Sequence, residues 1–373
     1  MPLQAAQSAP WETLVCCLVL LVAPAIAMRT PTAAWQMGGL VIALAVTLFA
    51  GEGAVAYGAA AGAALLHAVG AWRWTRTGAV ALGVAAVLTA AAGVALWQQH
   101  LTTAFCLSAL AIAVRAGVMP FHAGASSLCE RALVVQSQQL ATTIALVFVH
   151  FRFVDHHDGA IALAPLLVRL GAAVTFVPAL MSIVQRDLRG FYRTTTALHG
   201  GMLLAAIGAA SLDNFAAALL VMVTMGLALG GLGIAIAALE ERVGRVDFSG
   251  PGGRVQSFPR LAAAFAFFGA AGVGLPATAG FVADDLLLHT LWIESPASAV
   301  TVIVSSALLA VATLTCFARV FLGRATPSVA PDISRHESGV LVTLLVLLVV
   351  LGIAPGTLLA PADAFLSVVS GSR

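Results

Sequence analysis

The sequence predicts an all-α polytopic membrane protein. Of its 373 residues, 61% are hydrophobic and only 9% are charged, and the mean hydropathy is +1.01. A soluble globular domain is about half apolar and about a quarter charged. The apolar runs recur along the whole chain and are long enough to cross a bilayer as helices. This composition excludes an ordinary soluble domain, a disordered chain and a nucleic-acid-binding protein.

Twelve segments satisfy the requirement of about 20 mostly apolar residues for a transmembrane helix. The expected spans are 13–28, 35–51, 53–72, 77–98, 101–124, 131–151, 159–185, 194–211, 214–239, 258–292, 297–323 and 337–360. The second and third form one long apolar run, so eleven spans are the alternative. The tenth is too long for one straight helix.

Arginine placement predicts the orientation of these spans. All 18 basic residues are arginine, and the chain contains no lysine. With twelve spans, the loops on one side carry Arg29, Arg73, Arg76, Arg131, Arg186, Arg189, Arg193, Arg242, Arg245, Arg254, Arg260, Arg324 and Arg335. The other side carries Arg152 and Arg373. Loops rich in arginine stay in the cytoplasm, so both termini are expected on the non-cytoplasmic side of the membrane. We expect this membrane to be a bacterial inner membrane.

Two of the expected spans contain a similar interruption. Span 101–124 contains Pro120 followed by Gly124, and span 258–292 contains Pro276 followed by Gly280. Proline removes a backbone donor and clashes with the preceding turn, so we expect a helix break at each site. Interrupted spans at corresponding positions point to a transport site.

The two breaks are five spans apart, so the units that carry them run in opposite directions. We therefore expect one membrane domain over 1–373 that contains two inverted five-helix repeats. Its expected parts are N-terminal helices over 13–51, a first repeat over 35–151, a second repeat over 159–323 and a C-terminal helix over 337–360. The alternative is that the repeated Gly and Pro reflect only the ordinary abundance of these residues in membrane helices.

Ionisable residues inside the spans are candidates for the functional site. Arg115 lies in mid-span, and Glu52 is the natural guess for its partner, although Glu52 could equally be an exposed loop carboxylate. Asp284 and Asp285 follow the second break and could carry protons or cap a half-helix. His199 gives its span a polar face, although such residues often only join helices.

Four segments resemble the proton-pumping, antiporter-like membrane subunits. Residues 184–201 are similar to the family stretch "VQxDIKRxLAYSTxSQxGY", and residues 115–122 to its first broken helix. Residues 280–285 and 316–323 are similar to "GFFSKDE" and "FRxxFxxFxG". The family occurs in respiratory complex I, membrane-bound hydrogenases, multisubunit cation/proton antiporters and a two-protein inorganic-carbon transporter. Because its members typically have fourteen core helices, twelve spans indicate a shortened, divergent member.

The resemblance implies a proton pathway. Glu52 matches the family glutamate, Arg115 falls on its partner lysine, and Gln138 falls on a relay histidine. Asp284 falls on or beside the last lysine, and His122 belongs to the first broken helix. Every relay lysine is absent, and arginine keeps the charge without the ability to release a proton.

Three functions follow from the resemblance. The first is a membrane subunit that translocates protons or couples ion flux to a partner through Glu52, Arg115, His122, Gln138, His199, Asp284 and Asp285. The alternatives are the membrane subunit of an inorganic-carbon uptake complex and a non-conducting structural subunit. The sequence shows no catalytic site, cofactor site or metal site of its own. The chain is therefore at most a subunit of an oxidoreductase-like or hydrogenase-like complex, with other membrane subunits and lipid as partners.

Overall fold

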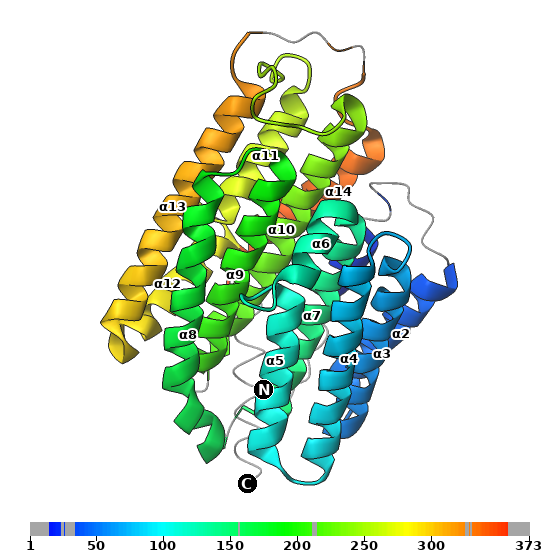
Figure 1. Ribbon diagram of the computed structural model, residues 1–373, viewed down its shortest axis with the longest axis vertical. Helices are drawn as coiled ribbons and strands as arrows, with labels where there is room; N and C mark the ends of the chain where they lie inside the picture. Colours follow the sequence, from blue (N-terminus) through cyan, green and yellow to red (C-terminus); the bar gives the residue numbers. More distant parts are fainter. Residues whose placement is uncertain are drawn as a thin grey trace.

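The protein was analysed as a computed structural model, which describes residues 15–23, 26, 34–155, 157–210, 215–324, 328 and 330–356. The described chain is a bundle of helices that run roughly along one axis (Figure 1). The helices are α2 (Ala34–Phe49), α3 (Gly53–Ala71), α4 (Arg76–Trp97), α5 (Leu101–Ala116), α6 (Ala123–Arg131), α7 (Leu133–Phe153), α8 (Asp158–Ile183), α9 (Leu188–Ala210), α10 (Phe215–Val243), α11 (Pro259–Ala271), α12 (Ala279–Glu294), α13 (Pro296–Phe321) and α14 (Arg335–Ile353). Residues 15–23 are also helical. The all-α prediction is confirmed for this part of the chain.

Six of the described helices are long and apolar enough to cross a membrane: α3, α4, α8, α10, α13 and α14. Helices α2, α5 and α11 are apolar but shorter. The long apolar run that begins at residue 35 is divided between α2 and α3, so two helices form there and not one. The total of twelve spans stays a prediction, and the expected spans 13–28 and 337–360 extend outside the described residues.

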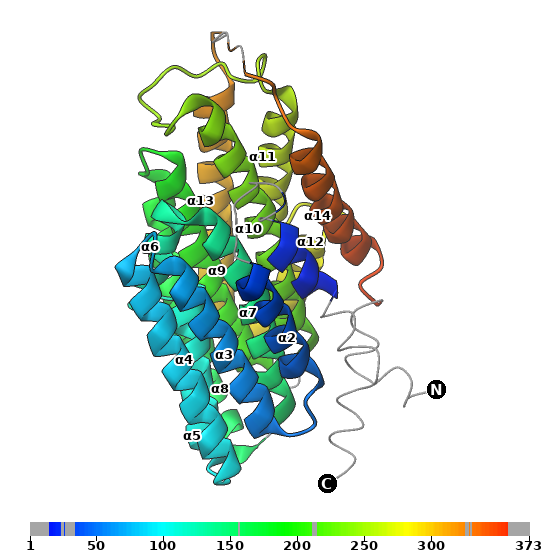
Figure 2. The same ribbon diagram turned by 90° about the vertical axis from the view of Figure 1, so that its right-hand side faces the viewer.

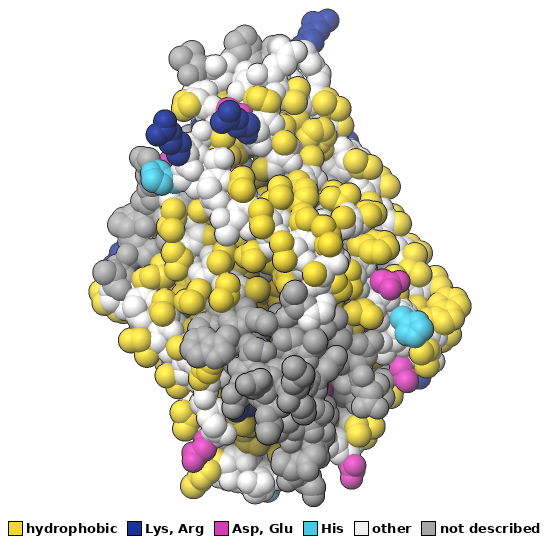
Figure 3. Space-filling view, turned by 180° about the vertical axis from the view of Figure 1, so that it is seen from behind, with side chains coloured by type: hydrophobic (Ala, Val, Ile, Leu, Met, Phe, Trp, Pro, Cys, Tyr) yellow, Lys and Arg dark blue, Asp and Glu magenta, His cyan; other side chains and the backbone are white. Residues whose placement is uncertain are grey.

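The surface of the bundle is typical of a protein that faces lipid or other membrane subunits. Apolar side chains cover the middle of the described surface, and arginines gather toward its upper end (Figure 3). Exposed tryptophans lie at helix ends, at Trp72 of the α3 C-cap, Trp97 at the end of α4 and Trp292 near the end of α12. Tryptophan is enriched at the two membrane–water interfaces because its ring is amphipathic.

The two expected breaks are present. Helix α5 ends at Ala116, where Gly117 takes the left-handed conformation with φ +76°, and α6 begins at Ala123. Helix α11 ends at Ala271, Gly274 has φ +81°, and α12 begins at Ala279. Glycine adopts positive φ without steric cost, which allows the chain to leave the helix just before each proline.

Gly124 and Gly280 do not take part in the breaks, contrary to the sequence expectation. Both lie in the first turn of the second half-helix. A Cβ atom at Gly124 would lie 2.1 Å from the Ala81 Cβ, and one at Gly280 would lie 2.1 Å from the Ala271 carbonyl oxygen. These glycines therefore allow close packing and do not interrupt the helix.

Helix α10 forms the centre of the bundle. Every residue in its most apolar window is buried, and it packs against α7, α9, α11, α12 and α14. Figure 2 shows α14 on the flank of the bundle, beside α10 and α12. The burial of α10 explains why its sequence is apolar on all sides.

Candidate functional site

Arg115 lies in the last turn of α5, directly before the first break, and is 1% exposed. Its Nε donates a hydrogen bond of 3.2 Å to the Thr143 hydroxyl, and its Nη2 donates to the Thr142 hydroxyl. The Gln139 amide donates to the Arg115 carbonyl oxygen. Helix α7 therefore holds both the side chain and the backbone of Arg115 with neutral groups.

The expected Glu52–Arg115 pair is not formed. Glu52 is the exposed N-cap residue of α3 and has no ion pair among the described residues. It precedes the start of α3, whereas Arg115 lies near the end of α5, and α3 and α5 begin at the same end of the bundle (Figure 1). Glu52 and Arg115 therefore differ in height along the bundle by about fourteen residues, which at 1.5 Å per residue is roughly 20 Å.

His67 of α3, and not Glu52, lies at the level of Arg115 in the bundle. It lies fourteen residues into α3, as Arg115 does in α5, and it interacts electrostatically with Arg115. His67 is fully buried, and neither ring nitrogen has a hydrogen-bond partner among the described residues. Sequence reasoning overlooked His67, although a single histidine in an apolar span was a visible signal.

The remaining candidates of the first half occupy separate positions. His122 is the half-buried residue that precedes α6, and its buried Nδ1 has no hydrogen-bond partner in the described chain. Gln138 is buried and donates a 3.3 Å hydrogen bond to the Leu21 carbonyl oxygen. Gln138 therefore joins α7 to the helical residues 15–23 and does not contact Arg115.

His199 of α9 connects directly to the second break. Its Nδ1 lies 2.8 Å from the Thr195 carbonyl oxygen, and its Nε2 lies 2.8 Å from the Gly272 carbonyl oxygen, just after α11 ends. A neutral imidazole has one donor, so only the protonated ring donates to both oxygens. Both ring nitrogens of His199 therefore face backbone acceptors.

Asp284 and Asp285 differ in their surroundings. Asp284 is partly buried, and a Cβ atom at Gly274 would lie 2.8 Å from its Oδ2, so the carboxylate faces the break. Asp285 is exposed on the outside of α12. Neither residue caps α12, because the helix begins at Ala279 and its first turn contains no acid, so the capping alternative was wrong.

The two breaks meet on α9. A Cβ atom at Gly200 would lie 2.6 Å from the carbonyl oxygen of Ala116, the last residue of α5. The adjacent His199 bonds to Gly272 at the end of α11. The hydroxyl groups of Thr194, Thr195 and Thr196 donate to carbonyl oxygens of α9 itself, and the Thr196 hydroxyl also accepts from the Cys129 thiol of α6. Neighbouring residues of α9 thus touch the two interrupted helices.

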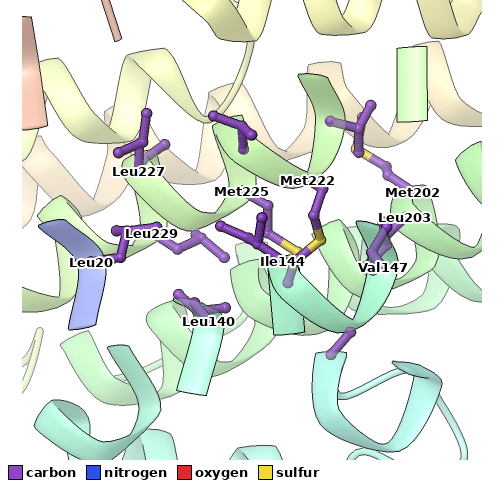
Figure 4. Close-up of a cluster of buried hydrophobic side chains, with 14 of the residues drawn as sticks. Leu20, Leu140, Ile144, Val147, Met202, Leu203, Met222, Met225, Leu227 and Leu229 are labelled. Carbon is purple, nitrogen blue, oxygen red and sulfur yellow. The ribbon is translucent and has the colours of Figure 1, made fainter. Parts of the chain in front are cut away.

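A second route between the halves, through α7 and α10, is closed by apolar side chains. We use the name central apolar layer for Leu140, Ile144 and Val147 of α7, Met202 and Leu203 of α9, and Met222 and Met225 of α10 (Figure 4). All of them are at most 3% exposed. Residues 217–239 of α10 contain no ionisable side chain, so this route lacks a protein group that exchanges protons.

A buried polar cluster near the end of α7 was missed by sequence analysis. The His150 Nδ1 lies 2.5 Å from the Ser108 hydroxyl, and its Nε2 lies 4.0 Å from the Asp155 carboxylate. Tyr57 of α3 is fully buried and within electrostatic range of Asp155. The Asp155 side chain is itself buried, although it lies at the end of α7 where the chain turns toward α8.

Ion pairs link the helix ends on the arginine-rich side. Arg189 pairs with Glu240 at 2.6 Å, and Arg242 pairs with Glu337 at 2.7 Å. In the loop after α10, the Arg245 pKa is raised by its hydrogen bond to Glu130. The pattern of arginines that predicted one side of the membrane also stabilises the packing of the helix ends there.

Comparison with known proteins identifies the family of this chain. Residues 37–310 match the family described as "NADH:quinone oxidoreductase/Mrp antiporter, TM". The chain belongs to this family. The match includes both breaks, Arg115, His199 and Asp284, so the family resemblance predicted from sequence is confirmed.

Curated relatives of this NADH:quinone oxidoreductase/Mrp antiporter family member include subunit M of NADH-quinone oxidoreductase. The Escherichia coli protein is 28% identical over 258 residues, which cover 67% of this chain and 51% of the relative. The Pseudomonas aeruginosa protein is 27% identical over 254 residues, which cover 66% of this chain and 49% of the relative. The chain thus spans about half the length of the curated relatives it matches.

Solved structures show the same fold. A chain of respiratory complex I from Thermus thermophilus superposes with a TM-score of 0.82 at 20% identity, over 97% of this chain and 84% of that one. A chain of the Mrp complex from Dietzia superposes with a TM-score of 0.78 at 17% identity, over 97% of this chain and 83% of that one. The helical arrangement is therefore that of membrane subunits in multi-subunit complexes.

Proposed function

We propose that this chain is a membrane subunit of a multi-subunit complex in the bacterial inner membrane, where it translocates protons or couples ion flux to a partner. The observation that carries this proposal is the contact of both interrupted helices with adjacent residues of α9, one of which is the buried His199. Family membership supports it, since the relatives are named as subunits of NADH-quinone oxidoreductase.

The proposal includes twelve spans in two inverted repeats, over 35–151 and 159–323, with both termini outside the cytoplasm. Support comes from the direction of the broken helices. The pair α5 and α6 runs toward the arginine-rich end, and the pair α11 and α12 runs away from it (Figure 1). Opposite directions at matching breaks are the property that an inverted repeat requires.

The proposed proton route starts at the end of the bundle where α7 ends. The cluster of Tyr57, Ser108, His150 and Asp155 supplies exchangeable groups there. Two helical turns along α5, about 10 Å, separate Ser108 from Arg115, and the proposal places a chain of ordered waters in this gap. From the Arg115 region, the route crosses α9 at His199 and reaches Asp284 beside the second break.

The remaining residues predicted from the sequence lie outside the central part of the proposed route. His122 lies at the start of α6 and Asp285 on the outer face of α12, where each would exchange protons with water or with a neighbouring subunit. Glu52 and Gln138 have no contact with the route in the described chain. We assign them no step.

Proton flux tests the route in proteoliposomes that contain the intact complex. We expect Asp284→Asn and His199→Phe each to lower the flux at least about tenfold, because each removes a group that binds and releases a proton. The matched control is Glu294→Gln, which removes an exposed carboxylate at the far end of α12. Its flux should equal that of the unmodified complex.

The central apolar layer favours a second candidate function, that of a structural subunit that does not conduct. It leaves α10 without a proton-exchanging group along the α7–α10 route. Unchanged flux in both Asp284→Asn and His199→Phe, in complexes that assemble normally, would reject the proposed route and favour this second function.

A further inference from the structure

Arg115 is a buried cation without a carboxylate partner in the described chain. All ion pairs among the described residues join other side chains. Its guanidinium donates only to the Thr142 and Thr143 hydroxyls, and both of these donate onward to the Gln139 carbonyl oxygen. The direct partners of Arg115 are therefore all neutral.

The surroundings of Arg115 do not supply the missing negative charge. The carbonyl end of α5 carries the equivalent of about half an elementary charge, which balances the guanidinium only in part. His67 is neutral or cationic, and never anionic. A charge that is not balanced in a dry interior carries a large desolvation penalty. Within the described part of the chain, the charge of Arg115 is therefore left for a negative ligand to balance.

Unpartnered atoms around Arg115 provide both donors and acceptors for such a ligand. The Arg115 Nη1, both His67 ring nitrogens and the Gln139 Oε1 are buried and have no hydrogen-bond partner among the described residues. The guanidinium offers a donor, the amide oxygen offers an acceptor, and a neutral imidazole offers one of each. All three side chains are at most 1% exposed. A ligand held among side chains this deeply buried would have only a few atoms.

We propose that Arg115, His67 and Gln139 bind one small monovalent anion. Chloride would satisfy the donors, and bicarbonate would in addition donate its hydroxyl to the Gln139 Oε1. The anion balances the fixed charge that arginine places in the membrane. The site goes beyond the proposed function, because both a conducting and a non-conducting subunit would hold the anion.

Thermal unfolding of the full chain in detergent tests this site. The protein is heated in sodium gluconate at fixed pH and ionic strength, and chloride or bicarbonate replaces gluconate stepwise. Gluconate is too large for a closed site. We expect the unfolding midpoint, followed by tryptophan fluorescence, to rise by about 2–4 °C across the titration, because a ligand that binds only the folded state stabilises it by RT ln(1 + [L]/Kd). A larger rise with bicarbonate than with chloride identifies an oxyanion site, a larger rise with chloride identifies a halide site, and equal rises identify an anion site without selectivity between them.

Two variants and one control locate the anion. Arg115→Gln should remove the anion-dependent shift, and Arg169→Gln, which removes an exposed arginine of α8, should retain it. Should Arg115→Gln not fold, His67→Phe keeps a ring of similar size and should weaken binding about fivefold by removing one hydrogen bond. Equal midpoints in all three anions, or a shift that persists unchanged in Arg115→Gln or His67→Phe, overturns the proposal. None of these measurements depends on proton flux, so this site and the proposed function can fail independently.

Discussion

The two broken helices have similar backbone breaks, but the charged side chains beside these breaks have opposite signs. In the first, a buried arginine precedes the break and is held by the hydroxyl groups of α7. In the second, the Asp284 carboxylate follows the break, and His199 bonds to the Gly272 carbonyl oxygen within it. The first site holds a fixed positive charge, and the second holds groups that gain and lose protons. The backbone of a break thus determines where a site forms, and the side chains determine what the site binds.

Substitution of the glycine that follows each proline by four residues tests most directly how the two broken helices are packed. At Gly280, the obstacle to a side chain is the backbone carbonyl of Ala271, which has no means of moving aside. We expect Gly280→Ala to destabilise the protein by about 3 kcal/mol, at the upper end of overpacking effects, in detergent unfolding experiments. A cost below about 1 kcal/mol would mean that α11 and α12 are not packed this closely.

Gly124 has a smaller expected effect, because its obstacle is the Ala81 side chain of α4. Gly124→Ala should cost about 2 kcal/mol by overpacking. Adding Ala81→Gly should restore most of the loss, measured as a double-mutant cycle. The double variant is the matched control, and an additive outcome would contradict the contact between α4 and α6.

A substitution in the central apolar layer tests whether the α7–α10 route differs from the proposed route through His199 only because it lacks a titratable group. Met222→His places a titratable ring in α10 without a large change in side-chain size. If the layer is the barrier of the α7–α10 route, proton flux should rise about tenfold, which corresponds to about 1.4 kcal/mol in the barrier. Met222→Leu keeps the site apolar and should leave flux unchanged. A flux that falls in Met222→His would place the barrier elsewhere.

The smallest expected effect concerns the hydroxyl groups that hold Arg115. Thr143→Val keeps the shape of the side chain and removes the 3.2 Å acceptor of the Arg115 Nε. We expect a loss of about 1–2 kcal/mol in the free energy of unfolding, typical of a hydrogen bond to a charged group. Thr313→Val is the control, because that hydroxyl bonds only to the Leu309 carbonyl in its own helix. Equal losses in both variants would indicate that Thr143 does not hold Arg115.

The locations of the helices and their interruptions were predictable from the sequence. Pro120 and Pro276 act through their own missing N–H groups and their clash with the preceding turn, which are properties of the local chain. The family resemblance was also visible in the sequence, because its motifs are short and contiguous. Asp284 was correctly placed beside the second break, since four residues along one helix separate it from Gly280.

The partners of the buried charges were decided only by the tertiary structure. Glu52 and Arg115 are the most obvious opposite charges in the first half, but the heights of α3 and α5 place His67, and not Glu52, at the level of Arg115. The contact of α9 with both breaks was equally hidden, because it depends on the rotation and height of three packed helices. Hydropathy sets which segments cross the membrane, whereas the side chains that meet inside it are set by helix register, which no single segment of the sequence contains.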